Sequence, residues 1–277
     1  MVESVASGAT RITEAFEGAR SDGRAALMPY MMGGFPDMKT SVAVADAYAE
    51  SGADLVELGV PFSDPLADGP VIHAAGTRAL AAGATLKGVL EICERLADRV
   101  PVVPMVYANM ALARGAKGFA RLLADAGASG AIIPDLPLGE EDSLGEALRG
   151  AGLAPVSLVA PTTTPERRRR ICERASGFAY VVSDTRVTGE RDELPEGLQA
   201  LVRAVRQDSA VPVAVGFGIG TPEQAAAVGA IADGVIVGSR LVRAVAESDG
   251  PAAAARAVGE FIRDAREAMA STGGPVG

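Results

Sequence analysis

A unit made of a short apolar run, a polar loop and an amphipathic segment recurs along the whole chain, at the spacing of a strand followed by a helix. The predicted strands are the apolar runs Ala26–Met32, Asp54–Val60, Val102–Tyr107, Gly130–Pro134, Ala154–Ala160, Phe178–Ser183, Val213–Phe217 and Gly234–Gly238. Strands that alternate with helices pair in parallel, and eight such units favour closure. The repeat therefore predicts an α/β protein with a (β/α)8 fold, a TIM barrel.

The segments between the runs carry apolar residues at helical spacing, such as Leu86, Val89, Leu90, Cys93 and Leu96. An additional helix, with Ile12, Ala15, Phe16 and Ala19 on one face, precedes the first strand and is expected to plug the base of the barrel. Without a linker rich in Pro, Gly or Ser, residues 1–277 are expected to form one domain, with a frayed tail from about residue 272.

An open, doubly wound sheet is the alternative fold. It usually carries a glycine-rich fingerprint directly after its first strand. The segment at that place, Met32-Gly33-Gly34-Phe35-Pro36, matches the fingerprint poorly. The barrel is therefore favoured.

The composition narrows the class of function. The net charge of −9 argues against binding to nucleic acid, whose phosphates repel an acidic chain. Cys93 and Cys172 are too few and too isolated for a disulfide framework or a zinc site, which suits a reducing compartment. No signal peptide and no apolar stretch of membrane-spanning length is visible, so a cytoplasmic protein is expected.

Active sites of such barrels lie at the carboxyl ends of the strands, and Glu57 lies there inside an apolar strand. A carboxyl group in a barrel interior is costly to ionise unless it is paired, so its pKa rises. A raised pKa suits proton transfer near neutral pH. The alternative is a structural glutamate that bonds to neighbouring backbone.

The loop that follows, Pro61–Pro70, contains Asp64 and Asp68 and is stiffened by prolines. Asp68 can reach the same pocket as Glu57. The competing interpretation is that Asp64-Pro65 and Asp68-Gly69 are only turn formers.

Two glycine-containing loops follow the last two predicted strands. Gly216-Phe217-Gly218-Ile219-Gly220 leads into a helix that starts with a capping box, and Gly238-Ser239 opens another helix. Barrels of this class often hold phosphate on main-chain N–H groups at this place. The spacing predicts a phosphate site, with ordinary helix capping as the alternative.

The long charged loop from Thr185 to Gly197 is expected to act as a lid, or else to be a surface excursion. The three lysines, Lys39, Lys87 and Lys117, fall in predicted helices, so a Schiff-base aldolase has no lysine at a strand end. The single histidine, His73, excludes a multi-histidine metal site. Once these two mechanisms are excluded, the expected chemistry is acid–base catalysis by carboxylates, without a cofactor or metal.

The segment from Glu57 to Pro70, with its core Leu58-Gly59-Val60-Pro61-Phe62-Ser63-Asp64-Pro65-Leu66-Ala67-Asp68-Gly69, closely resembles the signature of the tryptophan synthase alpha chain family. The resemblance extends from about Leu27 to Val245. Its supporting segments are Met105–Asn109, Pro134–Pro137, Val187–Gly189, Gly216–Ile219 and Gly234–Ser239.

The resemblance implies a carbon–carbon lyase that cleaves indole-3-glycerol phosphate to indole and glyceraldehyde 3-phosphate in a retro-aldol reaction. It implies that Glu57 protonates indole C3 and shuttles the proton, and that Asp68 pairs with the indole N–H. It further implies a beta-chain partner in an alpha2beta2 heterotetramer, with pyridoxal phosphate bound only by that partner, and Asp64 in the loop that contacts it.

Matching the family position by position implies roles for further residues. Tyr180 is expected near Glu57 as a third catalytic residue, and Thr188 is expected to close over Asp68. The residues expected around the indole are Tyr30, Met105, Tyr107, Phe217 and Thr188. Those expected at the phosphate are Gly189, Gly218, Gly238 and Ser239.

The lid departs from the family pattern, because Arg186 replaces a glycine and Asp184 stands where bulkier or basic residues are common. Two alternatives therefore stay open beside the complete alpha subunit. One is a stand-alone lyase that releases free indole. The other is a catalytically weakened barrel that only binds a partner.

Overall fold

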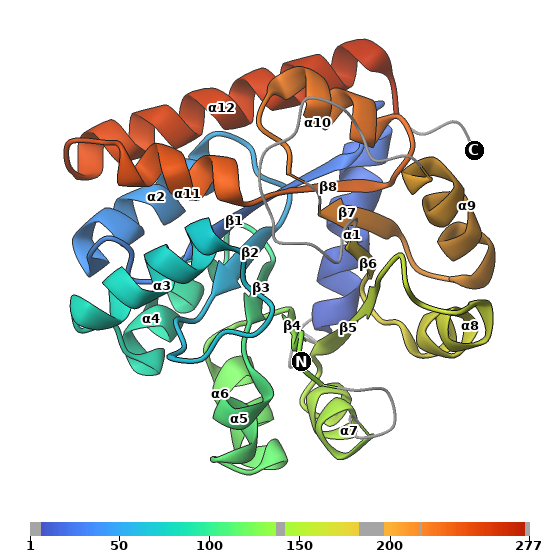
Figure 1. The fold of residues 1–277 in the computed structure, drawn as a ribbon, viewed down its shortest axis with the longest axis horizontal. Coiled ribbons are helices and arrows are strands. Elements are labelled where there is room, and N and C mark those ends of the chain that lie inside the picture. The colour runs from blue at the N-terminus through green and yellow to red at the C-terminus, as the bar shows by residue number, and fades with distance from the viewer. Residues whose placement is uncertain (1–6, 137–141, 183–196, 217, 275–277) are drawn as a thin grey trace, which may run out of the picture.

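The computed structural model describes residues 7–136, 142–182, 197–216 and 218–274. Eight parallel strands form a closed barrel in chain order, each bonded to the next and β8 bonded to β1, with helices around them (Figure 1). The strands are β1 Ala26–Met32, β2 Val56–Gly59, β3 Val102–Met105, β4 Gly130–Ile132, β5 Ala154–Val159, β6 Ala179–Val182, β7 Val213–Gly216 and β8 Gly234–Val237. The predicted (β/α)8 barrel is confirmed, and the doubly wound alternative is wrong.

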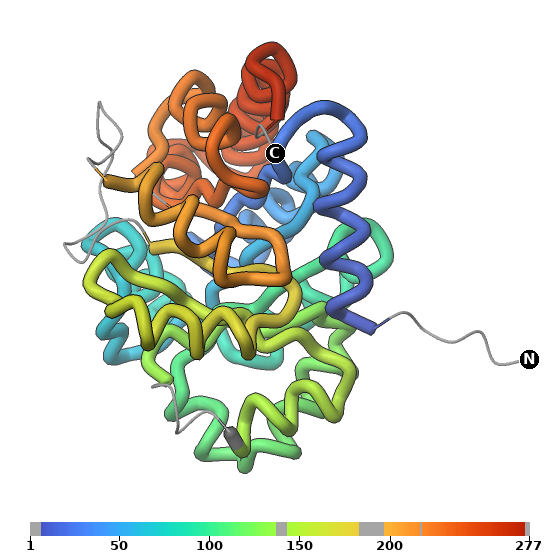
Figure 2. The backbone as a smooth tube through the Cα atoms, turned by 90° about the vertical axis from the view of Figure 1, so that its right-hand side faces the viewer, coloured from blue at the N-terminus to red at the C-terminus, as the bar shows by residue number. Residues whose placement is uncertain are grey.

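The helices of the described ranges form the outer layer and the base. They are α1 Gly8–Ser21, α2 Met38–Glu50, α3 Pro70–Ala81, α4 Leu86–Ala97, α5 Ala108–Leu112, α6 Ala116–Asp125, α7 Asp142–Gly150, α8 Pro165–Arg174, α9 Leu198–Asp208, α10 Pro222–Gly229, α11 Ser239–Ala246 and α12 Pro251–Thr272. In Figures 1 and 2, α12 and the pair α5 and α6 lie on opposite sides of the barrel.

Most predicted strands begin where the structure begins them, and β2, β3, β4, β5 and β8 end earlier than predicted. The predicted run Val102–Tyr107, for example, ends as a strand at Met105, and Tyr107 already caps helix α5. Apolar character continues past the end of β3 because Val106 and Tyr107 are still buried. The loops that build the mouth therefore start deeper in the barrel than the hydrophobic pattern indicates.

Helix α1 closes the base of the barrel, as predicted. Ile12 and Phe16 are buried with Met28 of β1 and Phe178 at the start of β6 in the cluster that fills the barrel interior. The rings of Phe16 and Phe178 lie 5.9 Å apart at a tilt of 44°. In Figure 2, α1 lies at the right-hand edge of the molecule.

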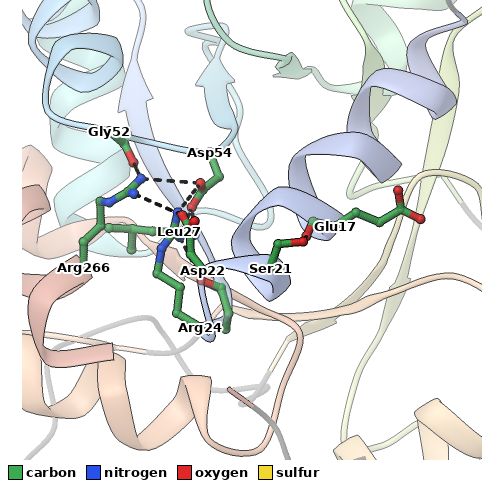
Figure 3. Close-up of polar contacts among 9 residues, drawn as sticks. Glu17, Ser21, Asp22, Arg24, Leu27, Gly52, Asp54 and Arg266 are labelled. Carbon is green, nitrogen blue, oxygen red and sulfur yellow. Dashed lines mark hydrogen bonds and ion pairs between the residues drawn. The ribbon is translucent and has the colours of Figure 1, made fainter. Parts of the chain in front are cut away.

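A compact ion cluster ties the amino-terminal ends of β1 and β2 to α12 (Figure 3). Both terminal nitrogens of the buried Arg24 bond to Asp54, at 2.6 and 2.8 Å, and one of them also bonds to Asp22 at 3.0 Å. Asp54 also accepts the N–H of Leu27 at 2.7 Å. Arg266 of α12 bonds to the carbonyl of Gly52 and lies 3.5 Å from Asp54. This end of the barrel is fixed by paired charges.

Several helices end where a glycine allows the left-handed conformation. Gly52, Gly127 and Gly152 have φ of 92°, 73° and 81° and follow α2, α6 and α7. Gly229 differs from them, because it is the last residue of α10 and Ala230 is the cap.

Cys93 and Cys172 are both free and buried. Among the described residues, the model has no helix long and apolar enough to cross a membrane. The last residues, 275–277, lie outside the described ranges, and α12 itself continues to Thr272.

Candidate active site

A pocket of about 110 Å³ opens at the carboxyl ends of the strands, where the sequence places the chemistry. Its lining residues come from opposite sides of the barrel. They are Tyr30, Glu57, Ala67, Asp68, Ile72, Met105, Tyr180, Gly216, Gly218, Ile219, Ile236, Gly238 and Ser239. Glu57 and Asp68 thus line the same pocket as Gly218, Gly238 and Ser239.

Glu57 of β2 is almost completely buried, with 5 % of its surface exposed. Its Oε2 has no hydrogen-bond partner among the described residues. Below it lies a small apolar cavity lined by Met28, Leu55 and Val103, among others. Burial, with a smaller effect from the negative charge of Asp68, raises the pKa of Glu57 to about 8. The structural alternative, a glutamate bonded to backbone, does not fit an oxygen without a partner.

Two tyrosines flank Glu57 on the inner face of the barrel, and each lies over a glycine of the next strand. Tyr30 of β1 pairs with Glu57 in register, and its hydroxyl occupies the space that a side chain at Gly59 would fill. Tyr180 of β6 stands in the same relation to Gly216. Burial raises the pKa of both hydroxyls, and the charge of Glu57 raises it further. Both tyrosines therefore stay protonated and can donate.

Asp68 lines the pocket from the loop after β2 and is half-buried. Its Oδ1 accepts a hydrogen bond from the hydroxyl of Tyr107 at 2.8 Å. Burial raises the pKa of Asp68, whereas the Tyr107 bond and the charge of His73 lower it. The interpretation of Asp68 as a mere turn former is insufficient, because its carboxyl lines the pocket and is bonded to Tyr107, the cap residue of α5.

Tyr107 differs from Met105 in its placement, although both are expected near the indole. Met105 lines the pocket, whereas Tyr107 is not among the lining residues and lies behind Asp68. Asp64 is exposed and accepts a bond from Ser63 at 2.6 Å, outside the pocket. His73 lies in the first turn of α3.

The two glycine-containing loops after β7 and β8 differ in which main-chain N–H groups they leave for an anion. Gly218 lines the pocket, together with Gly238 and the buried Ser239, the cap and first residue of α11. The N–H of Gly220, in contrast, donates to the side chain of Gln224 at 2.7 Å, within the capping box that Thr221 begins. Helix α10 therefore satisfies its own amino terminus, and the N–H groups left for an anion lie at Gly218 and α11.

Phe217, Thr188 and Gly189 lie outside the described residues, as do Asp184, Arg186 and the rest of the predicted lid before Gly197. The three lysines occupy α2, α4 and α6, away from the pocket, as predicted. Within the described ranges no group of three His, Cys, Asp or Glu residues could hold a metal ion.

Three isoleucines that line the pocket are missing from the sequence-based prediction: Ile72 of α3, Ile219 and Ile236 of β8. Ile236 pairs with Met28 in register and so faces the barrel interior. Strict alternation along β8 is the signal that could have identified it. Ile72 and Ile219 carry no such signal, since their direction depends on how the loops fold.

A larger cavity of about 520 Å³ shares Ala67 with the mouth pocket and extends over β4, β5 and β6. The acid among its described lining residues is Asp135, whose Oδ1 accepts the N–H of Ala108 at 2.8 Å. The unpaired carboxyl group with a raised pKa lies in the smaller pocket. Acid–base chemistry is therefore assigned to the smaller pocket.

Comparison with known proteins gives one consistent result. A family model described as tryptophan synthase alpha chain matches residues 16–270. The chain is 48 % identical over 256 residues to the tryptophan synthase alpha chain of Synechococcus sp. strain CC9902, covering 91 % of this chain and 95 % of the relative. It is 48 % identical over 238 residues to that of Carboxydothermus hydrogenoformans, covering 85 % and 89 %.

Solved structures give the same result. A structure of Mycobacterium tuberculosis tryptophan synthase superposes with a TM-score of 0.87 at 38 % identity, covering 96 % of this chain and 99 % of that chain. Tryptophan synthase subunit alpha of Legionella pneumophila strain Paris superposes with a TM-score of 0.84 at 36 % identity, covering 94 % and 98 %.

Proposed function

The chain belongs to the tryptophan synthase alpha chain family, and from that premise we propose that it cleaves the carbon–carbon bond of indole-3-glycerol phosphate by acid–base catalysis at Glu57. Family membership gives it the alpha-subunit role in tryptophan biosynthesis and a lyase activity on that substrate. The retro-aldol route and the residue roles below are the proposal.

Glu57 begins the cycle as the acid. With a pKa of about 8, it carries a proton at neutral pH. The proton passes to indole C3, and the bond between C3 and the glycerol chain then breaks, returning its electron pair to the ring. The hydroxyl on the released carbon gives up its proton to the Glu57 carboxylate as the aldehyde forms. The glutamate ends as it began, and indole and glyceraldehyde 3-phosphate are the products.

Asp68 accepts the indole N–H and stabilises the positive charge that C3 protonation places on the ring. Tyr180 supports the transfer beside Glu57. Tyr30 and Met105 enclose the indole from the described part of the pocket, with Tyr107, Phe217 and Thr188 completing the family set. We assign the phosphate to the N–H groups around Gly218, Gly238 and Ser239, with Gly189 as the lid contribution.

We further propose a cytoplasmic enzyme whose residues 1–277 act as one domain and need no cofactor or metal of their own. Asp64 lies on the exposed part of the loop after β2 and is our candidate contact to a beta chain in an alpha2beta2 tetramer. Pyridoxal phosphate is assigned to that partner.

The observation that carries the proposal is the buried, unpartnered Oε2 of Glu57 in a pocket that also contains Asp68 and the α11 amino terminus. Carboxyl groups are seldom buried unpaired without a function, because burial of such a group is costly.

The test is to incubate the purified chain with indole-3-glycerol phosphate and to measure indole by chromatography, with and without a tryptophan synthase beta chain. Slow release that accelerates when the beta chain is added is expected. Fast release that a beta chain does not change would instead identify a stand-alone lyase. Absence of indole in both arms, despite beta-chain binding, would leave only the partner-binding barrel and refute the proposed reaction.

A further inference from the structure

Tyr107 joins the acidic loop to the barrel through three contacts. Its hydroxyl donates to Oδ1 of Asp68 at 2.8 Å and accepts the N–H of Ala67 at 3.2 Å. Its ring stacks on Phe62, with centroids 5.2 Å apart and planes at 21°. Among the described residues, Tyr107 is the side chain outside the loop that hydrogen-bonds to it. Since Tyr107 is 2 % exposed and lies outside the pocket lining, these contacts account for its hydroxyl.

The position of Tyr107 is itself fixed from the next strand. Tyr107 is the cap residue of α5, and Ala108 supplies the first N–H of that helix. That N–H donates to Oδ1 of Asp135, which follows β4, at 2.8 Å. The first N–H groups of a helix lack partners within it, and a carboxylate is the acceptor best suited to them. Asp135 therefore anchors the backbone next to Tyr107, and the Tyr107 hydroxyl in turn bonds to Asp68.

We propose that Tyr107 is a positioning residue of the lyase: its hydroxyl holds Asp68 ionised and aimed into the pocket, and Asp135 holds Tyr107 in place. The inference rests on the proposed function, because it concerns the carboxylate that pairs with the indole N–H. It assigns the Tyr107 hydroxyl to the loop and not to the substrate, and it gives Asp135 a role within the same machinery.

Charge supports the same assignment. The titratable groups that act on Asp68 or are acted on by it are Tyr107, His73 of α3, Glu57 of β2 and Tyr30 of β1. Of these, the Tyr107 bond has the largest effect that lowers the pKa of Asp68, against a burial effect that raises it. Without that hydroxyl, the pKa of Asp68 rises further, so at a given pH a smaller fraction of Asp68 accepts the indole N–H as a carboxylate.

The decisive variant is Tyr107→Phe, which keeps the ring that stacks on Phe62 and removes only the hydroxyl. The dependence of kcat/KM on pH is measured for indole-3-glycerol phosphate with the beta chain present. We expect kcat/KM to fall about ten- to a hundredfold, the usual effect of losing a hydrogen bond to a charged group. The acidic limb of the profile moves to higher pH, while the basic limb, which Glu57 sets, stays in place.

Two further variants separate positioning from folding. Tyr48→Phe removes another buried hydroxyl, which donates to the main-chain oxygen of Tyr30 at 2.9 Å, and it is expected to lower thermal stability without moving the acidic limb. Asp135→Ala removes the acceptor for the Ala108 N–H and should shift the acidic limb as Tyr107→Phe does. Asp135→Asn keeps an acceptor oxygen and should restore most of the wild-type profile.

A Tyr107→Phe enzyme with the wild-type acidic limb overturns the inference, whether or not its rate has fallen, because a rate loss alone describes packing. If Tyr107→Phe does not fold, the two Asp135 variants decide by the same readout. If the wild type releases no indole, the proposed function is refuted, and this result is distinct from a failure of the inference about Tyr107. In that case ¹³C NMR titration of the Asp68 carboxyl in wild type and Tyr107→Phe still reports whether the bond exists.

Discussion

Two carboxyl groups lie close together in the sequence: the part-buried Asp54 precedes β2 at the base of the barrel, and the buried Glu57 lies within β2 and lines the mouth pocket. Asp54 accepts hydrogen bonds from both terminal nitrogens of Arg24 and from the N–H of Leu27. Glu57 keeps an oxygen with no partner among the described residues. The base of the barrel thus neutralises its buried charge, while the mouth leaves a carboxyl uncompensated. The same residue class is used for stability at one end and for proton transfer at the other.

The largest effect expected from this comparison is on turnover. Glu57→Gln removes the transferable proton and should lower kcat by about 10²–10⁴-fold, the usual contribution of a positioned acid–base group, with KM nearly unchanged. The matched control is Asp54→Asn, which alters the carboxylate at the base and should keep the turnover of each folded molecule. Steady-state indole release measures both, and a near-normal kcat for Glu57→Gln would remove the distinction between the two ends.

The second largest effect is expected on the stability of the fold, from the ion cluster at the base of the barrel. Arg24→Ala removes the buried guanidinium that bonds to both oxygens of Asp54 and leaves Asp54 only the ion pair with Arg266 at 3.5 Å, which should lower the free energy of unfolding by about 1.5–3 kcal/mol. Urea denaturation followed by circular dichroism gives the value. Arg95→Ala breaks an exposed pair with Asp46 and should leave the midpoint close to that of the wild type. Equal losses of unfolding free energy in the two variants would mean that the buried Arg24 pair is no more stabilising than the exposed Arg95 pair.

The smallest effect is a dependence of stability on pH that comes from the mouth. The pKa of Glu57 in the folded chain, about 8, lies above that of a glutamate in the unfolded chain, so the folded state binds more protons between the two values. The free energy of unfolding should therefore fall by about 1 kcal/mol per pH unit as the pH rises toward 8.

In Glu57→Gln this contribution disappears. The measurement is the difference between the wild-type and variant urea midpoints at pH 6, 7 and 8. Parallel curves for the two proteins across that range would show that Glu57 does not titrate there.

The strand positions were predictable because hydrophobic runs recur at a fixed spacing, and Glu57 was predictable because it interrupts such a run. The placement of Tyr107 was not, since its motif indicates a place at the mouth but not whether the side chain lies in the pocket or behind Asp68. The pairing of Arg24 with Asp54 was also not predictable. The two residues precede different strands, and the pairing of β1 with β2 brings them together. Residues 183–196 of the predicted lid lie outside the described ranges, so Thr188 and Gly189 stay predictions.

Helix α1 determines how molecules enter and leave the barrel. Because Ile12 and Phe16 pack with Phe178, the barrel is closed at its base and open only at its mouth. A ligand that enters past the loop after β2 therefore leaves through the same mouth. Release of one product and entry of the next substrate therefore compete for a single opening.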